Sequence, residues 1–176
     1  MIKICLLLTS LITTGKMILC DFDTDSKLEN WVVVDDVVMG GISEGQLNIN
    51  EQGNAVFKGR VSTENNGGFS SVRHSFETIE TLEYSKVMIR LKGDGKQYQF
   101  RVKTAKYDRH SYVYDFKTSG DWEIIEIPLA EMEPRFRGRI LDMSNYPGKF
   151  LEEIAFLIGN KKEESFQLEI DHIILD

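Results

Sequence analysis

Residues 31–43 read W-V-V-V-D-D-V-V-M-G-G-I-S, and residues 65–73 read N-N-G-G-F-S-S-V-R. Each stretch combines a glycine doublet with small polar residues and large apolar side chains. Glycine reaches backbone conformations that other residues avoid, so such a doublet is typical of a tight backbone crossing at the end of a strand. The two stretches favour a fold of short strands and sharp turns, and neither has the composition of a catalytic motif.

Two aspartates interrupt the apolar run of the first stretch. Asp35 and Asp36 follow three valines, and an ionised carboxylate inside a strand is costly unless it is hydrogen-bonded or paired. We therefore expect the strand to end near Asp35, and Asp36 to accept hydrogen bonds from the backbone at 40–41, from Ser70 or from Arg73. Two interpretations stay open: a lock that pins the turn, and a recognition loop that presents two carboxylates.

Most of the remaining chain alternates apolar and polar side chains with a period of two, which is the pattern of half-buried strands. Helical spacing is nearly absent. Besides a first strand after residue 17, the strand-like segments lie at 31–35, 55–61, 72–76, 87–91, 97–103, 112–116, 122–129, 154–158 and 166–170. This pattern predicts an all-β fold, a β-sandwich of the jelly-roll type with roughly nine or ten strands.

Three connections can be predicted in more detail. The sequence K-G-D-G-K at 92–96 lies between two alternating segments, which predicts a hairpin. Pro128 marks its segment as an edge strand or as the end of a strand. The segment 131–148 has neither period and contains two prolines and two glycines, so we expect a long surface excursion with at most one helical turn.

Length and charge bound the class of protein. The 176 residues suffice for one well-buried core, and we expect a single domain over 17–176. A formal charge of -7 argues against a general nucleic-acid or anionic-membrane surface, because such partners require a net positive footprint.

The segment 1–16 resembles a short secretory leader. It has Lys3 near its start, an apolar run and a small-residue end, and it is too short for a stable membrane span. A leader predicts export to the periplasm or cell envelope. A start at Met17 predicts a cytoplasmic protein instead.

The sequence contains no recognisable set of catalytic residues. His74, His110 and His172 lack the spacing of metal ligands with one another and with Cys20. A nucleophile elbow, a phosphate-binding loop and a dinucleotide fingerprint are also missing from the sequence. We therefore predict a non-enzymatic protein with no metal and no cofactor.

Several separated motifs, in a fixed order, give the chain a resemblance to a known family. They are Trp31, D-D-V-V-M-G-G at 35–41, Ser43, F-K-G at 57–59, N-G-G-F-S-S at 66–71, Arg73, G-D-G at 93–95, the strand at 122–128 and R-G-R at 137–139. Through most of 19–174 the chain thereby resembles the complex I intermediate-associated protein 30 family. The resemblance implies a galactose-binding-like β-sandwich and a non-catalytic role, because the mitochondrial members act as assembly factors for respiratory complex I. The chain lacks their long targeting extension and is similar to the compact bacterial versions.

Two surfaces are candidates for binding. One is the solvent-facing side of 97–103 beside a tyrosine-containing loop, where planar polar groups could contact a sugar or a peptide. An ordinary solvated sheet face shows the same pattern. The other surface consists of three arginines around Phe136, which could bind carboxylates on a partner or the chain's own Glu131, Glu133 and Asp142.

Two functional hypotheses follow from these surfaces and the two glycine stretches. The first is a protein-complex assembly or chaperone-like factor that binds a protein partner. The alternative is a carbohydrate-binding protein of the cell envelope that binds a glycan through Gln99, Arg101, Tyr107 and Tyr112. The candidate binding residues are Asp35, Asp36, Met39, Gly40, Gly41, Ser43, Asn66, Gly67, Gly68, Phe69, Ser70, Arg73, Gln99, Arg101, Lys103, Tyr107, Arg109, Tyr112, Arg135, Arg137 and Arg139.

Overall fold

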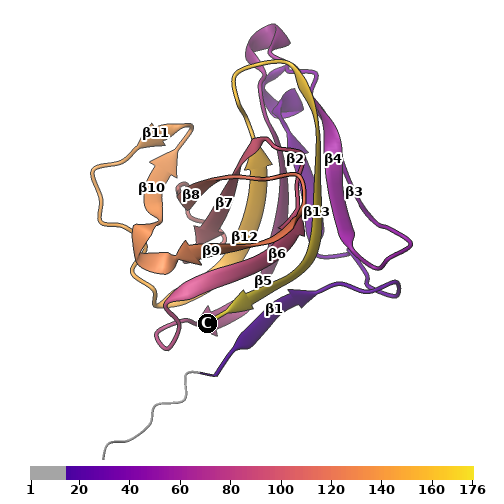
Figure 1. The fold of residues 1–176 in the computed structure, drawn as a ribbon. Helices are drawn as coiled ribbons and strands as arrows, with labels where there is room; N and C mark the ends of the chain where they lie inside the picture. Colours follow the sequence, from indigo (N-terminus) through magenta and orange to yellow (C-terminus); the bar gives the residue numbers. More distant parts are fainter. Residues whose placement is uncertain (1–14) are drawn as a thin grey trace, which may run out of the picture.

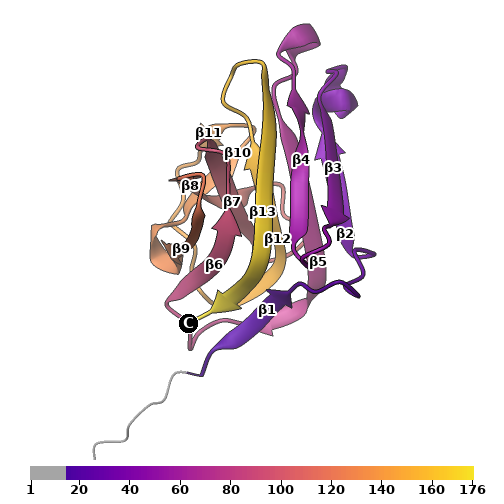
Figure 2. The ribbon, with the colours of Figure 1, turned by 45° about the vertical axis from the view of Figure 1, so that its right-hand side comes forward.

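The computed structural model describes residues 15–176, apart from the side chains at 38 and 39. Two antiparallel β-sheets pack face to face (Figure 1; Figure 2). The described residues contain no α-helix. Apart from its last two residues, the predicted leader at 1–16 lies outside the described residues.

The first sheet has six strands and the second has seven. The first runs in the order β3 (Glu44–Ile49), β4 (Ala55–Val61), β13 (Glu164–Leu175), β6 (Lys86–Lys92) and β9 (Trp122–Pro128), and β1 (Met17–Asp21) also pairs with β13. The second runs in the order β11 (Arg139–Ile140), β10 (Glu133–Phe136), β8 (Ser111–Lys117), β7 (Gln97–Lys103), β12 (Phe150–Ile158), β5 (Ser70–Glu80) and β2 (Trp31–Asp35). Three short 3-10 helices lie in the connections: η1 (Asp36–Met39), η2 (Glu64–Asn66) and η3 (Leu129–Glu131).

The core lies between the sheets and takes about every second side chain of the central strands. On β7, Tyr98, Phe100 and Val102 point inward and are buried. Gln99 and Arg101 point the opposite way, because successive side chains of a strand alternate between its two faces. The predicted all-β sandwich of the jelly-roll type is confirmed. It has thirteen strands within 15–176 rather than nine or ten, because β3, β10 and β11 were not predicted.

Both glycine doublets lie at crossings between the sheets. η1 and the first doublet lead from β2 of the second sheet to β3 of the first. η2 and the second doublet lead from β4 of the first sheet back to β5 of the second. The two views show the two short helices close together at one end of the sandwich (Figure 1; Figure 2). The interpretation of both stretches as crossings at strand ends is confirmed.

The predicted hairpin around 92–96 is wrong. β6 belongs to the first sheet and β7 to the second, so their connection crosses between the sheets. Asp94 holds this crossing, because its carboxylate accepts hydrogen bonds from the Tyr98 hydroxyl (3.0 Å) and from the backbone N–H of Gln167 (2.9 Å) on β13. The two strands turn their apolar sides toward one core from opposite layers, and a hairpin would have placed both strands in the same layer.

The segment 131–148 contains more regular structure than its irregular sequence predicts. β10 pairs with β8, and β11 folds back on β10. Met132 and Tyr146 are buried in the core, and the Tyr146 hydroxyl donates a hydrogen bond to the carbonyl oxygen of Phe150 (2.8 Å). The excursion therefore extends the second sheet by two strands. β9 lies at the edge of the first sheet, as Pro128 predicts.

Candidate functional site

Asp36 joins the two crossings. Its side chain is fully buried and accepts hydrogen bonds from the backbone N–H and hydroxyl of Ser43 (3.0 and 2.5 Å) and from the backbone N–H groups of Gly68 (2.5 Å) and Phe69 (3.2 Å). Burial alone would raise the pKa of this carboxyl group, but the hydrogen bonds favour its charged form and hold the pKa below its usual range. Asp36 is therefore an ionised carboxylate that fixes both crossings from within.

Asp35 connects two further strands to the same end of the sandwich. Its carboxylate accepts hydrogen bonds from the Ser70 hydroxyl (2.6 Å) on β5 and from the backbone N–H of Gly45 (3.0 Å) on β3. The Ser43 hydroxyl in turn accepts a hydrogen bond from the N–H of Ser62 (2.9 Å), just beyond β4. All four strands that meet the crossings are thus connected through two aspartates and three serines.

The two glycines of the first doublet are required for different reasons. Gly40 has a φ of +90°, a conformation that favours glycine, and a Cβ atom there would meet open space. Gly41 does not have a positive φ, but a Cβ atom on it would overlap the carboxylate of Asp36. Gly67 also lies against this carboxylate, with only 2.5 Å between Oδ2 and an added Cβ. Close backbone approach to Asp36 therefore accounts for one glycine in each doublet.

These contacts are those of a lock on the turn. Asp36, Ser43 and Ser70 are buried and their polar side-chain atoms are hydrogen-bonded within the chain, so they are not presented to a ligand. The groups that donate to the Asp36 side chain differ from those expected. Ser70 donates to Asp35 instead, and the donors to Asp36 are Ser43 and backbone N–H groups of the second crossing. The side chain of Met39 lies outside the described residues.

A groove of about 740 Å³ lies on the outer face of the second sheet. We call it the arginine groove. Nine predicted binding residues line it: Gly68, Phe69, Arg73, Gln99, Arg101, Lys103, Arg109, Arg135 and Arg137. Its other lining residues are Ser71, Ser111, Phe136, Gly138, Glu153, Ala155, Leu157 and Gly159. None of those on β12 was predicted, because the sequence 150–158 is largely apolar and gives only a weak indication of which face is buried.

Strand register places two arginines of the groove on either side of a small residue. Arg73 on β5 and Arg101 on β7 are both Cα partners of Ala155 on β12. Two strand spacings separate the arginine Cα atoms, which is about 10 Å. The side chain between them is a single methyl group, so the floor of the groove is low at this point.

The carboxylates near this floor are already paired with basic side chains. The pairs are Asp115 with Arg135 (2.6 Å), Glu133 with Arg135 (2.8 Å) and Glu153 with Lys103 (3.3 Å). Arg101 has no such partner among residues 15–176 and donates from Nε and Nη2 to the amide oxygen of Gln99 (3.0 and 2.6 Å). Burial, together with the positive charges of Arg73 and Arg135, lowers the pKa of Arg101 to about 10, although the nearby Asp115 carboxylate acts in the opposite direction.

Two buried polar atoms of the groove also lack a hydrogen-bond partner within the described chain. They are Ser71 Oγ and Arg135 Nε. Buried polar atoms in folded proteins are nearly always hydrogen-bonded, so each such atom needs an explanation. A floor with an unpaired cation and unpaired polar atoms has the chemistry of a site for an anionic group.

The aromatic ring of Phe136 is covered by arginines. The guanidinium carbons of Arg109 and Arg137 lie 5.0 and 5.4 Å from the ring centroid. Both distances are within the range of a cation–π contact. The loop after β10 therefore presents positive charge to the groove in place of an open aromatic surface.

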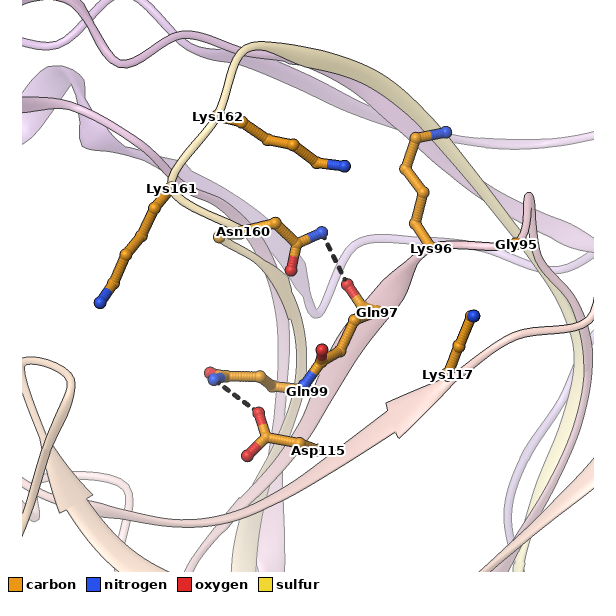
Figure 3. Close-up of a pocket in the computed structure, with 10 residues that line it drawn as sticks. Gly95, Lys96, Gln97, Gln99, Asp115, Lys117, Asn160, Lys161 and Lys162 are labelled. Carbon is orange, nitrogen blue, oxygen red and sulfur yellow. Dashed lines mark hydrogen bonds between the residues drawn. The ribbon is translucent and has the colours of Figure 1, made fainter.

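A second hollow, of about 610 Å³, adjoins the groove, and Gln99 and Gly159 line both. Its rim carries Lys96, Lys117, Lys161 and Lys162 (Figure 3). We call it the lysine hollow. In Figure 3, Gln99 donates a hydrogen bond to Asp115 (2.9 Å), and Asn160 donates one to the carbonyl oxygen of Gln97 (3.1 Å). These lysines were not predicted, since they come from three separate segments.

The arginine groove and the lysine hollow together gather basic residues on one face and contain few acidic ones. They are lined by ten of its 21 Lys and Arg residues but by only two of its 28 Asp and Glu residues, Asp115 and Glu153. One face is therefore strongly basic in a chain whose formal net charge is -7.

Apart from the residues that form the lock, four predicted binding residues line neither hollow. Tyr112 is 7% exposed and packs on Tyr146 in the core, so its ring does not lie open to a sugar. Its position follows from the alternation of β8, which turns Ser111 and Asp115 outward. Tyr107 is 86% exposed but does not line either hollow, and Arg139 and Asn66 are exposed on β11 and η2. Of the four residues proposed for a sugar site, Gln99 and Arg101 lie together in the groove, and Tyr107 and Tyr112 do not line it.

Within residues 15–176, no three His, Cys, Asp or Glu side chains gather as potential metal ligands. In the same part of the chain, no helix has the length and apolar composition of a transmembrane span.

The chain has the fold class of a jelly-roll sandwich of two antiparallel sheets, with a polar hollow on the outer face of one sheet. The family 11 carbohydrate-binding module of the cellulosomal cellulase Lic26A-Cel5E of Clostridium thermocellum has this fold, with a TM-score of 0.67 at 20% identity over 92% of this chain and 94% of that one. Within this class, the chain belongs to the complex I intermediate-associated protein 30 (CIA30) family, whose model matches residues 20–170.

Curated relatives of the chain come from animals. The complex I intermediate-associated protein 30, mitochondrial, of Drosophila melanogaster is 26% identical over 89% of this chain, and that of Mus musculus is 23% identical over 86%. The chain covers 61% and 53% of these proteins, respectively. These relatives do not support the expectation of a bacterial type.

Proposed function

We propose that this chain is a non-enzymatic assembly or chaperone-like factor that binds a protein partner through the outer face of its seven-stranded sheet. The observation that carries the proposal is the gathering of ten basic residues around the arginine groove and the lysine hollow. A basic face on an acidic molecule favours a partner of complementary charge and orients it during encounter.

The family supports the same class of function. The curated relatives are named for association with complex I intermediates, and their names describe no reaction. An intermediate in the assembly of a respiratory complex is therefore the first partner to test. Because the chain spans little more than half the length of these relatives, a complex I role is part of the proposal.

The lining of the groove supports binding over catalysis. It contains no histidine or cysteine, and its acidic member, Glu153, is paired with Lys103. General acid–base chemistry requires a titratable group within reach of a substrate and poised near the working pH. The described lining offers fixed positive charge and hydrogen-bond donors instead.

Glycan binding is the second candidate function. The observation that favours it is the connected row of Arg101, Gln99 and Asp115, because such planar polar groups can hydrogen-bond sugar hydroxyls. The covered ring of Phe136 and the buried position of Tyr112 weaken it, since they leave no open aromatic platform in the groove.

Partner capture beside glycan screening tests the proposal. We expect the tagged full chain to recover the same protein partner from its host in repeated experiments and to retain no glycan on an array. Charge reversal of the exposed Arg137 and Lys117 should abolish capture. The matched reversal of Lys27 and Lys92, which are exposed and line neither hollow, should preserve it. Repeated recovery of no protein, together with retained glycans, would overturn the proposal.

A further inference from the structure

The floor of the arginine groove contains cationic groups that no residue of the described chain neutralises. The carboxylates of Asp115, Glu133 and Glu153 are engaged by Arg135 and Lys103. Neither Arg73 nor Arg101 forms an ion pair with any residue in 15–176. Holding a partly buried guanidinium beside like charges costs free energy, so this arrangement is expected to be stabilised when an anion binds.

We infer that the arginine groove binds an extended acidic peptide segment, with one carboxylate of the segment placed over Ala155 between Arg73 and Arg101. The inference rests on the proposed function and specifies the chemistry of the partner segment. The register supports this placement, because Arg73, Ala155 and Arg101 occupy one row across three adjacent strands.

The donor groups suit a carboxylate. A guanidinium presents parallel N–H groups that match the two oxygens of a carboxylate, which a lysine ammonium does not. Arg101 directs Nε and Nη2 to Gln99, so Nη1 is left for a ligand. Ser71 lies two residues before Arg73, on the same face of β5. Its buried hydroxyl has no hydrogen-bond partner in the described chain and can donate to the same ligand.

The dimensions suit an extended chain. The groove draws residues from β5, β12, β7, β8 and β10, and five strands at about 4.8 Å spacing cover roughly 20 Å. An extended peptide advances about 3.3 Å per residue, so about six residues cross the groove. Phe69 and Leu157 add apolar surface for the side chains between the acidic positions, and the lysine hollow continues the positive charge beyond Gln99.

A phosphate polymer fits this face less well. Nucleic acids carry a negative charge on every unit and bind to continuous positive surfaces. Here Asp115, Glu133 and Glu153 alternate with the basic residues, and the ring of Phe136 is covered by arginines and unavailable for stacking on bases. A peptide can place its carboxylates only where the groove is positive.

Fluorescence anisotropy with the full chain tests the inference. The probes are labelled eight-residue peptides with Glu or Asp at alternate positions and varied neutral or apolar residues between, each paired with a twin carrying Gln or Asn. We expect acidic peptides to bind at least about tenfold more tightly than their twins, with affinity falling as salt rises. Arg73→Gln and Arg101→Gln should each weaken binding by about tenfold or more.

Two further variants separate binding from folding. Arg101→Lys retains the charge but loses the fork, so it should recover only part of the affinity. Lys92→Gln removes a basic residue that lines neither hollow and should leave the affinity unchanged. The Tm of Arg101→Gln should be no lower than that of the parent, because the substitution removes an unneutralised charge. A lowered Tm with unchanged peptide affinity would show a structural role and overturn the inference.

The remaining outcomes are also decisive. The inference is wrong if no acidic peptide exceeds its amide twin, if both arginine variants bind as the parent does, or if heparin or single-stranded DNA binds where acidic peptides do not. If the tagged double variant Arg73→Gln, Arg101→Gln still captures the parent's protein partner, the inference fails while the proposed function stands. The charge reversal of Arg137 and Lys117 tests the proposed function separately, through the loss of partner capture.

Discussion

Asp36 is the residue on which the geometry of both crossings depends, because one buried carboxylate accepts four hydrogen bonds from them. Asp36→Ala leaves these donors without a partner. We expect a loss of at least about 3 kcal/mol in the free energy of unfolding. For a chain of this length the loss corresponds to a Tm lowered by roughly 6–12 °C in a thermal scan. The exposed Asp142→Ala is the control and should stay within about 0.5 kcal/mol of the parent. A Tm equal to the parent's in Asp36→Ala would refute the lock.

The two glycines of the first doublet should respond differently to substitution. Gly40→Ala meets open space and costs only the positive φ, about 1 kcal/mol. Gly41→Ala drives a methyl group into the Asp36 carboxylate, which its hydrogen bonds prevent from moving aside. Chemical denaturation should therefore rank Gly41→Ala as the more damaging of the two. The reverse order would show that backbone conformation, and not close approach, governs this doublet.

The low pKa of Asp36 makes part of the stability dependent on pH. The folded state stabilises the ionised carboxylate of Asp36 more than the unfolded state does. Its contribution to the unfolding free energy is therefore complete above the unfolded pKa of about 3.9 and is lost as the pH falls through the lower folded pKa. We expect the difference in unfolding free energy between the parent and Asp36→Ala to be constant from about pH 7 to 5 and to shrink below about pH 4. A difference that grows on acidification would contradict this assignment.

At the residue scale, the sequence predicted that the Asp36 carboxylate would accept hydrogen bonds. It did not predict which groups would donate them. A buried carboxylate among valines has to be hydrogen-bonded, and that requirement can be read without a structure. The identity of the donors depends on how Asp36 in the first crossing meets Gly68 in the second, 32 residues further along the chain. No local sequence pattern contains that information.

At the scale of elements, the connection between β6 and β7 shows where local turn signals fail. Tyr98→Phe tests the account of this crossing, because it removes the hydroxyl that donates to Asp94 while keeping the buried ring. We expect a loss of about 1 kcal/mol. In urea denaturation the midpoint should fall while the slope m stays constant. An unchanged midpoint would show that the hydroxyl contributes nothing to the crossing.

The strands themselves were predictable wherever one face is buried and the other is solvated, as along β4, β7 and β8. The predicted hairpin failed because alternation identifies a buried face but does not say to which sheet the strand belongs. β10 and β11 were missed because their sequence, rich in arginine with a proline and a glycine, resembles a loop, and they form by pairing with the edge of β8.

At the scale of the whole molecule, the distribution of charge matters more than its sum. A net charge of -7 argues against a basic surface only if the charges are mixed, and here ten basic residues are gathered on one face. The sequence pointed to Arg101 through its position on an alternating strand, to Arg135 and Arg137 through their spacing in an expected loop, and to Arg73 through the second glycine stretch. It missed the lysines, Ser71 and Ala155, because only the folded sheet places them beside those arginines.

Site-specific photo-crosslinking in the host tests most directly the claim that a protein partner binds on the arginine groove. A photo-reactive amino acid in place of Lys103, within the groove, should form a crosslink to the partner recovered by capture, and so should one in place of Lys117, in the lysine hollow. The same amino acid in place of Lys58 or Lys92, on β4 and β6 of the other sheet, should form none. Crosslinks that arise from the first sheet and not from these two hollows would contradict the account.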